Sequence, residues 1–508
     1  MKRIVFVVGM CFLIYMSKVT YGQEKTGSTN KLTFEEALEV TNQNSYVLKQ
    51  AEYNTLQKEE ELKAARGLFF PKLSLNASYV FMSEDLSLDL NPVKDAITPI
   101  YSALSNFGEF SGVPNPDPNT SGFMPILTDE LSTQAVRGQL AEGLNQINSA
   151  EWDKMIQKKQ FGYINAVFTQ PIFTGGKIIA ANKAAQIKVE EAQVENKQKQ
   201  FELTSELVER YYALVLSYNA KKIRADVKET MQTHLSDAEK MMSQGLIAKA
   251  EYLHAKVYSS EANREYKKIL RQLDILNDAL INTMAIKENV DIVPVSNLFY
   301  LEKIEDIQYF WDNAEEKSPL LQKIEKKKEL AYQGYKVEKS KAYPTIAAIG
   351  TYDILNKDLS PYVPEYLVGV TMKWDIFSGV STARKINAAK FRQKLVDNFY
   401  NKADSDIKTA ITKYYQEINM YLEQLHELES ALEFANEYNR VREKAFKEGM
   451  ATTTEVSDAS LALAKVKIER LQVIYNYDVS LSKLLYFSGL SDEFENYQKN
   501  NNAKYENY

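Results

Sequence analysis

The chain has 508 residues, of which 44% are hydrophobic and 26% are charged, and its formal net charge is −6. An acidic chain is a poor nucleic-acid binder, because the phosphate backbone attracts basic surfaces. The negative mean hydropathy excludes a membrane protein built from many apolar helices.

The first 22 residues predict a secretory signal peptide. Lys2 and Arg3 precede an apolar run over residues 4–16, and cleavage is expected before Gln23. The run is short for a transmembrane helix of about 20 residues. The only cysteine, Cys11, lies inside this run. The exported chain would therefore contain neither a disulfide nor a thiolate.

Helices and then strands are predicted in the next part of the chain. Thr33 and Glu36 form a capping box that begins a short helix, and a second helix is expected over 46–67. Apolar and polar residues then alternate in four segments of 11 or 12 residues, at about 71–82, 163–173, 344–355 and 366–377. A tilted strand of this length can cross a bilayer, although each strand taken alone equally fits a sheet with one wet face.

A long segment separates the first two strands. Residues 83–162 contain the proline-rich stretch 113–119 and predict an exposed excursion from the body of the protein. The corresponding connection in the second pair of strands is much shorter. If the strands cross a membrane, residues 83–162 would form an extracellular loop.

Long helices follow each pair of strands. Residues 175–244 contain no proline and predict a rod of roughly 105 Å at about 1.5 Å per residue. A return helix is expected over 246–285. The second half of the chain repeats this pattern, with a helix leading into the strands at 318–341, a long helix at 379–448 and a return helix at 450–488.

An internal repeat underlies this pattern. The stretch Ile172-Phe173-Thr174-Gly175 recurs as Ile376-Phe377-Ser378-Gly379, and Gly245 recurs as Gly449; both pairs are 204 positions apart. We therefore expect a first structural repeat at 23–286 and a second at 287–490, which begins with a segment at 287–317. A polar C-terminal tail is expected at 491–508.

Four strands in one chain are too few to close a membrane-spanning barrel, which starts at about eight strands. An open sheet in lipid would leave backbone groups unpaired, at a cost of several kcal/mol each. If these strands lie in a membrane, strands from several chains must therefore share one barrel.

At this point the chain resembles the TolC family of outer-membrane efflux proteins, also called outer membrane factors. The resemblance covers the exported chain and is carried by Leu32-Thr33-x-x-Glu36-Ala37-Leu38, by Gln170-Pro171-Ile172-Phe173-x-Gly175-Gly176 and by the two glycine hairpins. It implies a mixed α/β membrane protein, mainly α. Three protomers would form a homotrimer that shares one transmembrane β-barrel above a long α-helical barrel of coiled-coil hairpins.

The resemblance also implies a location and partners. The location is the outer membrane of a Gram-negative-type bacterium, with a long extension into the periplasm. A mixed girdle would surround the helices, built from residues near Lys31, from 287–319 and from the C-terminal tail. The partners would be a periplasmic adaptor (membrane fusion) protein and an inner-membrane pump.

The function implied is that of a passive exit channel for small molecules, gated at its periplasmic tip. The outer-membrane component of a type I protein secretion system is the first alternative. A soluble periplasmic coiled-coil adaptor or scaffold is an alternative from another class. The sequence does not identify the cargo.

The tips of the helical hairpins carry the candidate site residues. By resemblance, acidic residues beyond the hairpin glycine surround the pore entrance, and the matching positions here are Asp458 and Glu455, with Glu251 in the other hairpin. Three copies of each would favour cations. Charged pairs of this kind also occur on ordinary solvated helix faces. The expected adaptor-docking residues are Gly245, Leu246, Gly449 and Met450.

Some family members close the tip with an arginine and a tyrosine. The matching positions here are Ala451 and Phe446, so that contact cannot form, and Lys249 or Lys444 are possible substitutes.

No enzyme is predicted. His234, His254 and His426 stand singly without metal-ligand spacing, and no nucleophile motif or phosphate-binding glycine loop is present. We therefore expect neither a cofactor nor a metal.

Overall fold

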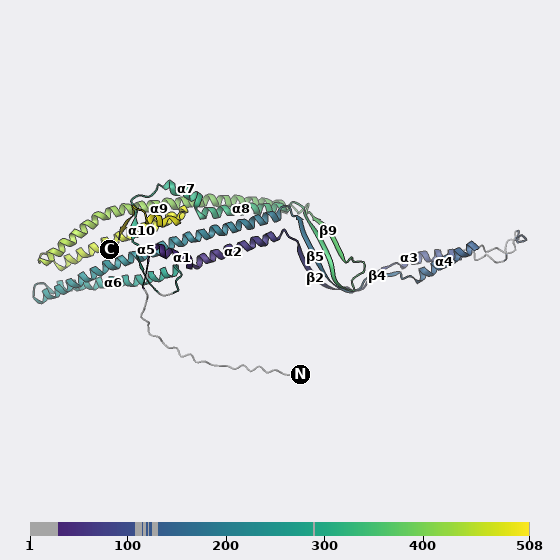
Figure 1. The fold of residues 1–508 in the computed structure, drawn as a ribbon, viewed down its shortest axis with the longest axis horizontal. Coiled ribbons are helices and arrows are strands. Elements are labelled where there is room, and N and C mark those ends of the chain that lie inside the picture. The colour runs from purple at the N-terminus through teal and green to yellow at the C-terminus, as the bar shows by residue number, and fades with distance from the viewer. Residues whose placement is uncertain are drawn as a thin grey trace, which may run out of the picture. The chain divides into compact units, whose positions relative to one another are not determined.

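The computed structural model describes residues 29–106, 114, 118–119, 121–123, 131–287, 290–506 and 508. The predicted signal peptide lies outside the described residues. The chain divides into two compact units (Figure 1). Of the described residues, those within 1–62, 183–334 and 388–508 belong to unit 1, and those within 63–182 and 335–387 belong to unit 2.

Helices make up most of the chain. The two long helices, α5 and α9, are both 67 residues long, as expected for two copies of one structural unit. No helix in the described ranges is both long and apolar enough to span a bilayer. The helices outside the 83–162 segment are α1 Phe34–Asn44, α2 Tyr46–Gly67, α5 Lys177–Ser243, α6 Lys249–Thr283, α7 Ile307–Lys317, α8 Pro319–Ser340, α9 Ser381–Lys447, α10 Thr453–Ser488 and α11 Phe494–Gln498, with the 3₁₀ turn η1 Ser491–Glu493.

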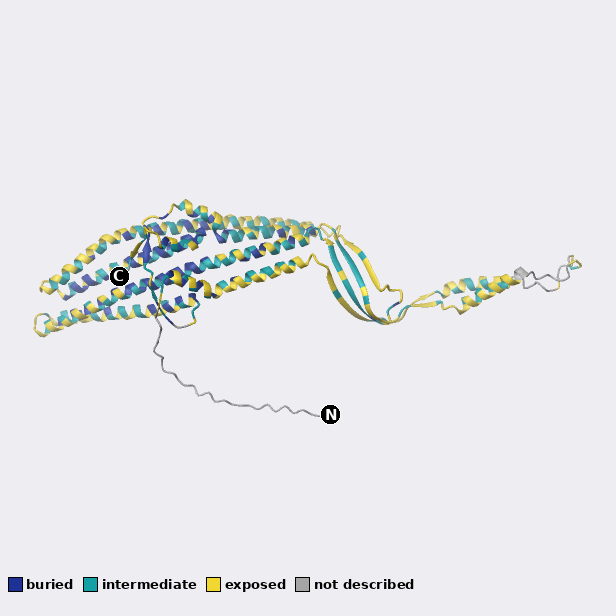
Figure 2. Ribbon diagram, in the orientation of Figure 1, coloured by how far each residue is buried: buried dark blue, intermediate teal, exposed yellow. Residues whose placement is uncertain are grey.

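Unit 1 contains two small sheets that join distant parts of the sequence. Strand β1 (Thr29–Leu32) pairs in parallel with β6 (Asp291–Pro294), and β7 (Leu298–Tyr300) pairs antiparallel with β10 (Lys504–Glu506). In this way the N-terminal strand, the segment between the repeats and the C-terminal segment come together. Burial in unit 1 is concentrated where these segments cover the helices (Figure 2).

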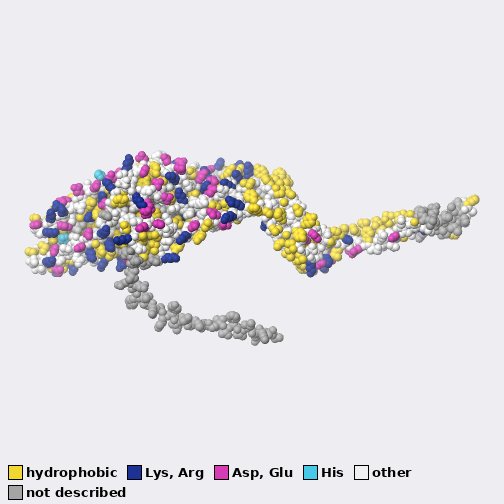
Figure 3. All heavy atoms as spheres, viewed as in Figure 1, with side chains coloured by type: hydrophobic (Ala, Val, Ile, Leu, Met, Phe, Trp, Pro, Cys, Tyr) yellow, Lys and Arg dark blue, Asp and Glu magenta, His cyan; other side chains and the backbone are white. Residues whose placement is uncertain are grey.

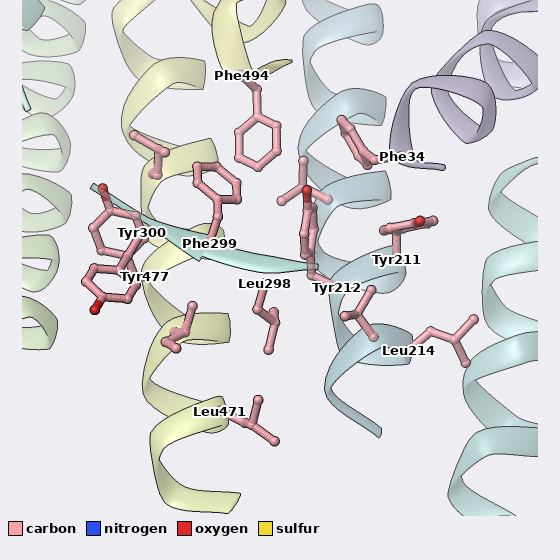
Figure 4. Close-up of a cluster of buried hydrophobic side chains, with 14 of the residues drawn as sticks. Phe34, Tyr211, Tyr212, Leu214, Leu298, Phe299, Tyr300, Leu471, Tyr477 and Phe494 are labelled. Atoms are coloured by element: carbon pink, nitrogen blue, oxygen red, sulfur yellow. The ribbon is translucent and has the colours of Figure 1, made fainter. Parts of the chain in front are cut away.

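An aromatic cluster forms the core beneath these sheets (Figure 4). Phe34 is fully buried, and its ring lies 5.6 Å from the Tyr211 and Tyr212 rings and 5.3 Å from that of Phe494. The Tyr211 hydroxyl donates to the Leu32 carbonyl oxygen at 2.7 Å. The C-terminal segment, expected to be a polar tail, therefore contributes a core residue.

Unit 2 is built on an antiparallel sheet with the strand order β2-β5-β8-β9. Its strands are β2 Lys72–Phe81, β5 Gln160–Phe173, β8 Thr345–Lys357 and β9 Tyr366–Lys373. The register places Leu75, Ala166, Tyr352 and Tyr366 in one row across all four strands. The predicted apolar positions therefore share one face, which is largely exposed, and hydrophobic side chains gather over these strands (Figure 3).

Strand β9 is shorter than predicted. It ends at Lys373 rather than near Phe377, because Lys373 pairs with Thr345, the first residue of β8, and β8 offers no partner further along.

The segment 83–162 differs from the predicted loop. Its described parts form a two-stranded ribbon, β3 (Leu86–Asp89) with β4 (Asp153–Gln157), and two helices, α3 (Asn91–Ser105) and α4 (Leu131–Ser149). Helix α3 has proline in its first turn, a position where the missing N–H costs nothing. The apolar residues of this segment recur at helical spacing, and this pattern was overlooked when a loop was predicted.

Candidate functional site

Both helical hairpins of unit 1 turn on a glycine with a left-handed backbone. Gly245 has φ +73° and Gly449 has φ +74°, a conformation that residues with a side chain rarely adopt. The next amide in each turn bonds back to the helix: Leu246 donates to the Met241 carbonyl at 2.9 Å, and Met450 donates to the Ala445 carbonyl at 2.8 Å. This is the Schellman ending of a helix.

The residues after these glycines project into solvent. Leu246 is 65% exposed and Met450 is 75% exposed. Large apolar side chains at this exposure gain little from burial within the described chain. The four predicted docking residues therefore form two matching turns, each with one exposed apolar side chain.

The two hairpins contact each other near their tips. Between α6 and α10, the Tyr258 hydroxyl donates to Asp458 Oδ1 at 2.9 Å. Between α5 and α9, the ring of His234 meets that of Phe446 edge to face at 5.2 Å. The hydrogen bond to Asp458 raises the pKa of Tyr258, so the hydroxyl keeps its proton throughout the physiological range.

Glu455 has a local structural role. Its carboxylate accepts from the Thr452 amide at 2.8 Å, while the Thr452 hydroxyl accepts from the Glu455 amide at 3.2 Å, which completes a capping box at the start of α10. Arg442 on α9 also lies 3.2 Å from Glu455 Oε1. The backbone hydrogen bond to Thr452 lowers the pKa of Glu455, so the carboxylate stays ionised.

The other predicted acidic residues have different surroundings. Asp458 is exposed on α10, one turn beyond Glu455. Glu251 lies in the first turn of α6, where its Oε2 is buried without a hydrogen-bond partner in the described chain. No hydrogen bond or ion pair among the described residues links Glu251 to Asp458 or Glu455.

The structure also shows the surroundings of the four residues considered for closing the tip. Phe446 packs against His234, and Ala451 is half-buried in the turn that leads into α10. Lys249 and Lys444 are both exposed.

A groove of about 710 Å³ lies between α5 and α9 beside the tip. His234 is 8% exposed in this groove, and neither ring nitrogen has a hydrogen-bond partner among the described residues. Burial lowers the pKa of His234, although Asp237 on α5 and Glu443 on α9 act in the opposite direction. The imidazole is therefore neutral at neutral pH.

Three contact residues of this site, Tyr258, Arg442 and His234, were not predicted from sequence. The Thr452–Glu455 capping box has a readable signal, the Thr-x-x-Glu pattern. Tyr258 has none, because its contact with Asp458 depends on how two hairpins pack. Among the described residues no cluster of acidic, histidine or cysteine side chains could hold a metal ion.

The chain was compared with protein-family models, curated proteins and solved structures. A family model described as "Outer membrane efflux protein" matches residues 156–285 and 311–489, more than half of the chain. No curated protein matches the chain in sequence.

Several solved structures share the fold. They include VceC from Vibrio cholerae (14% identity, TM-score 0.63, covering 90% of this chain and 96% of that one) and the CmeC outer membrane channel from Campylobacter jejuni (12%, 0.66, 92% and 89%). The MtrE outer membrane channel from Neisseria gonorrhoeae matches at 12% identity with a TM-score of 0.65, covering 90% and 89%. At these identities the structures show the fold alone.

Proposed function

Because the chain belongs to the outer membrane efflux protein family, and is therefore an outer-membrane channel rather than an enzyme, we propose that it is the passive exit channel of a tripartite efflux pump. Three copies assemble into one tunnel that carries small molecules from the periplasm to the outside. The observation that carries this proposal is the four-stranded sheet with two open edges.

The open edges require neighbours in a membrane. In the described chain β2 and β9 are each paired on one side only. Lipid offers no hydrogen bonds, so each unpaired backbone group there costs several kcal/mol. The exposed apolar face, including Leu75 at 68% and Val368 at 80%, suits contact with lipid tails. Pairing β2 of one copy with β9 of the next satisfies both edges and closes a barrel.

The tip is held shut in this proposal by the Tyr258–Asp458 contact. The residues that close the tip in some TolC-like proteins are replaced here by Ala451 and Phe446. The hydrogen bond between α6 and α10 joins the two hairpins at the same level. Its release would let the hairpins separate, and three exposed Asp458 carboxylates would then favour cations at the entrance.

The adaptor docks on the exposed turns in this proposal. Leu246 and Met450 are the apolar side chains that a helical partner can cover, and the glycines before them set the direction of the turns. An inner-membrane pump then engages the channel through that adaptor.

Drug susceptibility tests the proposal. A strain without the gene receives the wild type, the double variant Leu246→Glu/Met450→Glu, or the control Ile275→Glu, which changes an equally exposed apolar residue on α6 away from the tip. We expect the double variant to leave the strain as susceptible as the deletion, while the control restores resistance and trimer levels stay equal. Full resistance with the double variant would exclude docking at these turns. If the deletion changed no susceptibility to small molecules, the efflux role would be wrong.

A further inference from the structure

The segment between β2 and β5 extends their hairpin well beyond the sheet. The Met82 amide donates to the Lys159 carbonyl at 2.8 Å, and the Leu90 amide donates to the Trp152 carbonyl at 2.7 Å. Backbone pairing therefore continues from the sheet through the β3–β4 ribbon to the base of the two helices (Figure 1). Along the chain, the edge strand β2 leads through β3 into α3, while α4 leads back through β4 to the inner strand β5.

Helices α3 and α4 already pack against each other through one face. On α3 this face holds the half-buried Ile97 and Tyr101, and on α4 it holds Leu140 and Leu144. The Tyr101 ring lies against Gly143, where an added Cβ would come within 3.1 Å of the ring. The inner faces of this helix pair are therefore occupied.

The flank of α3 beside this contact is also apolar. Val93 is 48% exposed, Ile100 57% and Leu104 45%, and they lie at helical spacing with Ala96 between them. No charged residue follows Asp95 in α3. We call Val93, Ala96, Ile100 and Leu104 the α3 stripe. An apolar helix face is normally buried over its whole width, and α4 covers only one side of this face.

The outer face of α4 is different. Its exposed positions include Gln139, Glu142, Asn145 and Gln146, which suit water. One larger apolar side chain of α4, Val136, is also 52% exposed, near the start of that helix. The α3 stripe is the longer apolar surface that this helix pair leaves exposed among its described residues.

We propose that the α3 stripe is an interface between copies of this chain, in which the stripes of the three protomers pack against one another around the mouth of the channel. This inference rests on the proposed trimer. Strand β2 is the edge strand that pairs with the neighbouring copy, and β2 leads along the chain into α3. The contact between α3 stripes therefore continues the contact between the copies in the shared sheet. The neighbour's α4 offers a polar surface, so its own α3 stripe is the matching apolar partner.

Symmetry favours this contact. A threefold axis relates the three stripes, so each makes the same contacts with the other two. Because all three are attached to one barrel, their effective concentration is high. Burying the exposed parts of Ile100 and Leu104 in this contact then stabilises the bundle.

Disulfide cross-linking tests the inference. The sequence holds one cysteine, in the predicted signal peptide, so a single introduced cysteine has no internal partner in the exported chain. Ile100→Cys and Leu104→Cys are compared with Gln139→Cys on the outer face of α4, after mild oxidation of whole cells. Three chains can form one pair, so dimers are expected to approach about two thirds of the protein for the stripe variants. The control is expected to stay monomeric on a denaturing gel.

The native mass of each variant separates the two proposals. A trimer whose stripe variants form no more dimer than Gln139→Cys would overturn this inference and leave the proposed channel intact. Loss of the trimer in the wild type as well would overturn both.

Discussion

The Tyr258–Asp458 contact gives the most specific prediction for the closed tip. Changing Tyr258 to Phe removes one hydroxyl and keeps the ring, so the packing of α6 on α10 is retained. The charge of Asp458 also stays in place. The variant therefore tests the hydrogen bond separately from the acidic ring.

The expected size of the effect follows from the geometry. The oxygen atoms are 2.9 Å apart and the acceptor is a carboxylate, but the pair is exposed to solvent. We therefore use a net contribution of about 1 kcal/mol per contact, which is that of an ordinary hydrogen bond and lies below the range for buried bonds to charged groups, because water competes for both partners. Three contacts in a trimer give about 3 kcal/mol, which changes the ratio of open to closed channels by roughly a hundredfold.

Single-channel recording in planar bilayers measures this ratio. Tyr258→Phe is expected to raise the ratio of open to closed channels by that factor while the cation preference stays unchanged. Tyr252→Phe is the matched control, since its hydroxyl makes no hydrogen bond in the described part of the chain. An unchanged open fraction for Tyr258→Phe in an intact trimer would refute the role of this contact.

Three further outcomes follow from other parts of unit 1. Phe34→Ala empties the centre of the aromatic cluster and is expected to cost about 3–5 kcal/mol, seen as a lower melting temperature; an unchanged melting temperature would contradict that packing. Thr452→Ala removes the cap of α10, worth about 1 kcal/mol, and should speed hydrogen exchange in its first turn but not elsewhere. Burial lowers the pKa of His234, so the unfolded state takes up a proton that the folded state resists, and stability at the tip falls as pH drops below about 6.5. The protection of the α5–α9 tip amides, corrected for the slower intrinsic exchange at low pH, should therefore fall at pH 5 in the wild type and in His254→Leu but not in His234→Leu. An equal loss of protection in all three would exclude His234 as the cause.

Local patterns in the sequence predicted much of the fold. Alternation located the four strands because one face is apolar, and the register places Leu75 and Tyr352 in the same row, as the alternation requires. Proline-free stretches and hairpin glycines located α5 and α9, because a long helix needs no distant partner to be recognised. The fold class was therefore predicted correctly.

The parts that were missed depend on contacts between distant residues. Nothing near Lys504 shows that it pairs with Tyr300, or that Phe494 packs against Phe34. Segment 83–162 was predicted to be an exposed loop because of its prolines. The helical spacing of Val93 and Ile100 was not taken into account. At the tip, the sequence identified acidic residues but not their partners, because Tyr258 and Asp458 meet only when two hairpins pack together.

The most direct test of the central claim is the native mass of the protein extracted with detergent from the outer membrane. The account predicts a particle of three chains, because the free edges of β2 and β9 must pair between copies. A particle containing one chain, stable and inserted in the membrane, would contradict it.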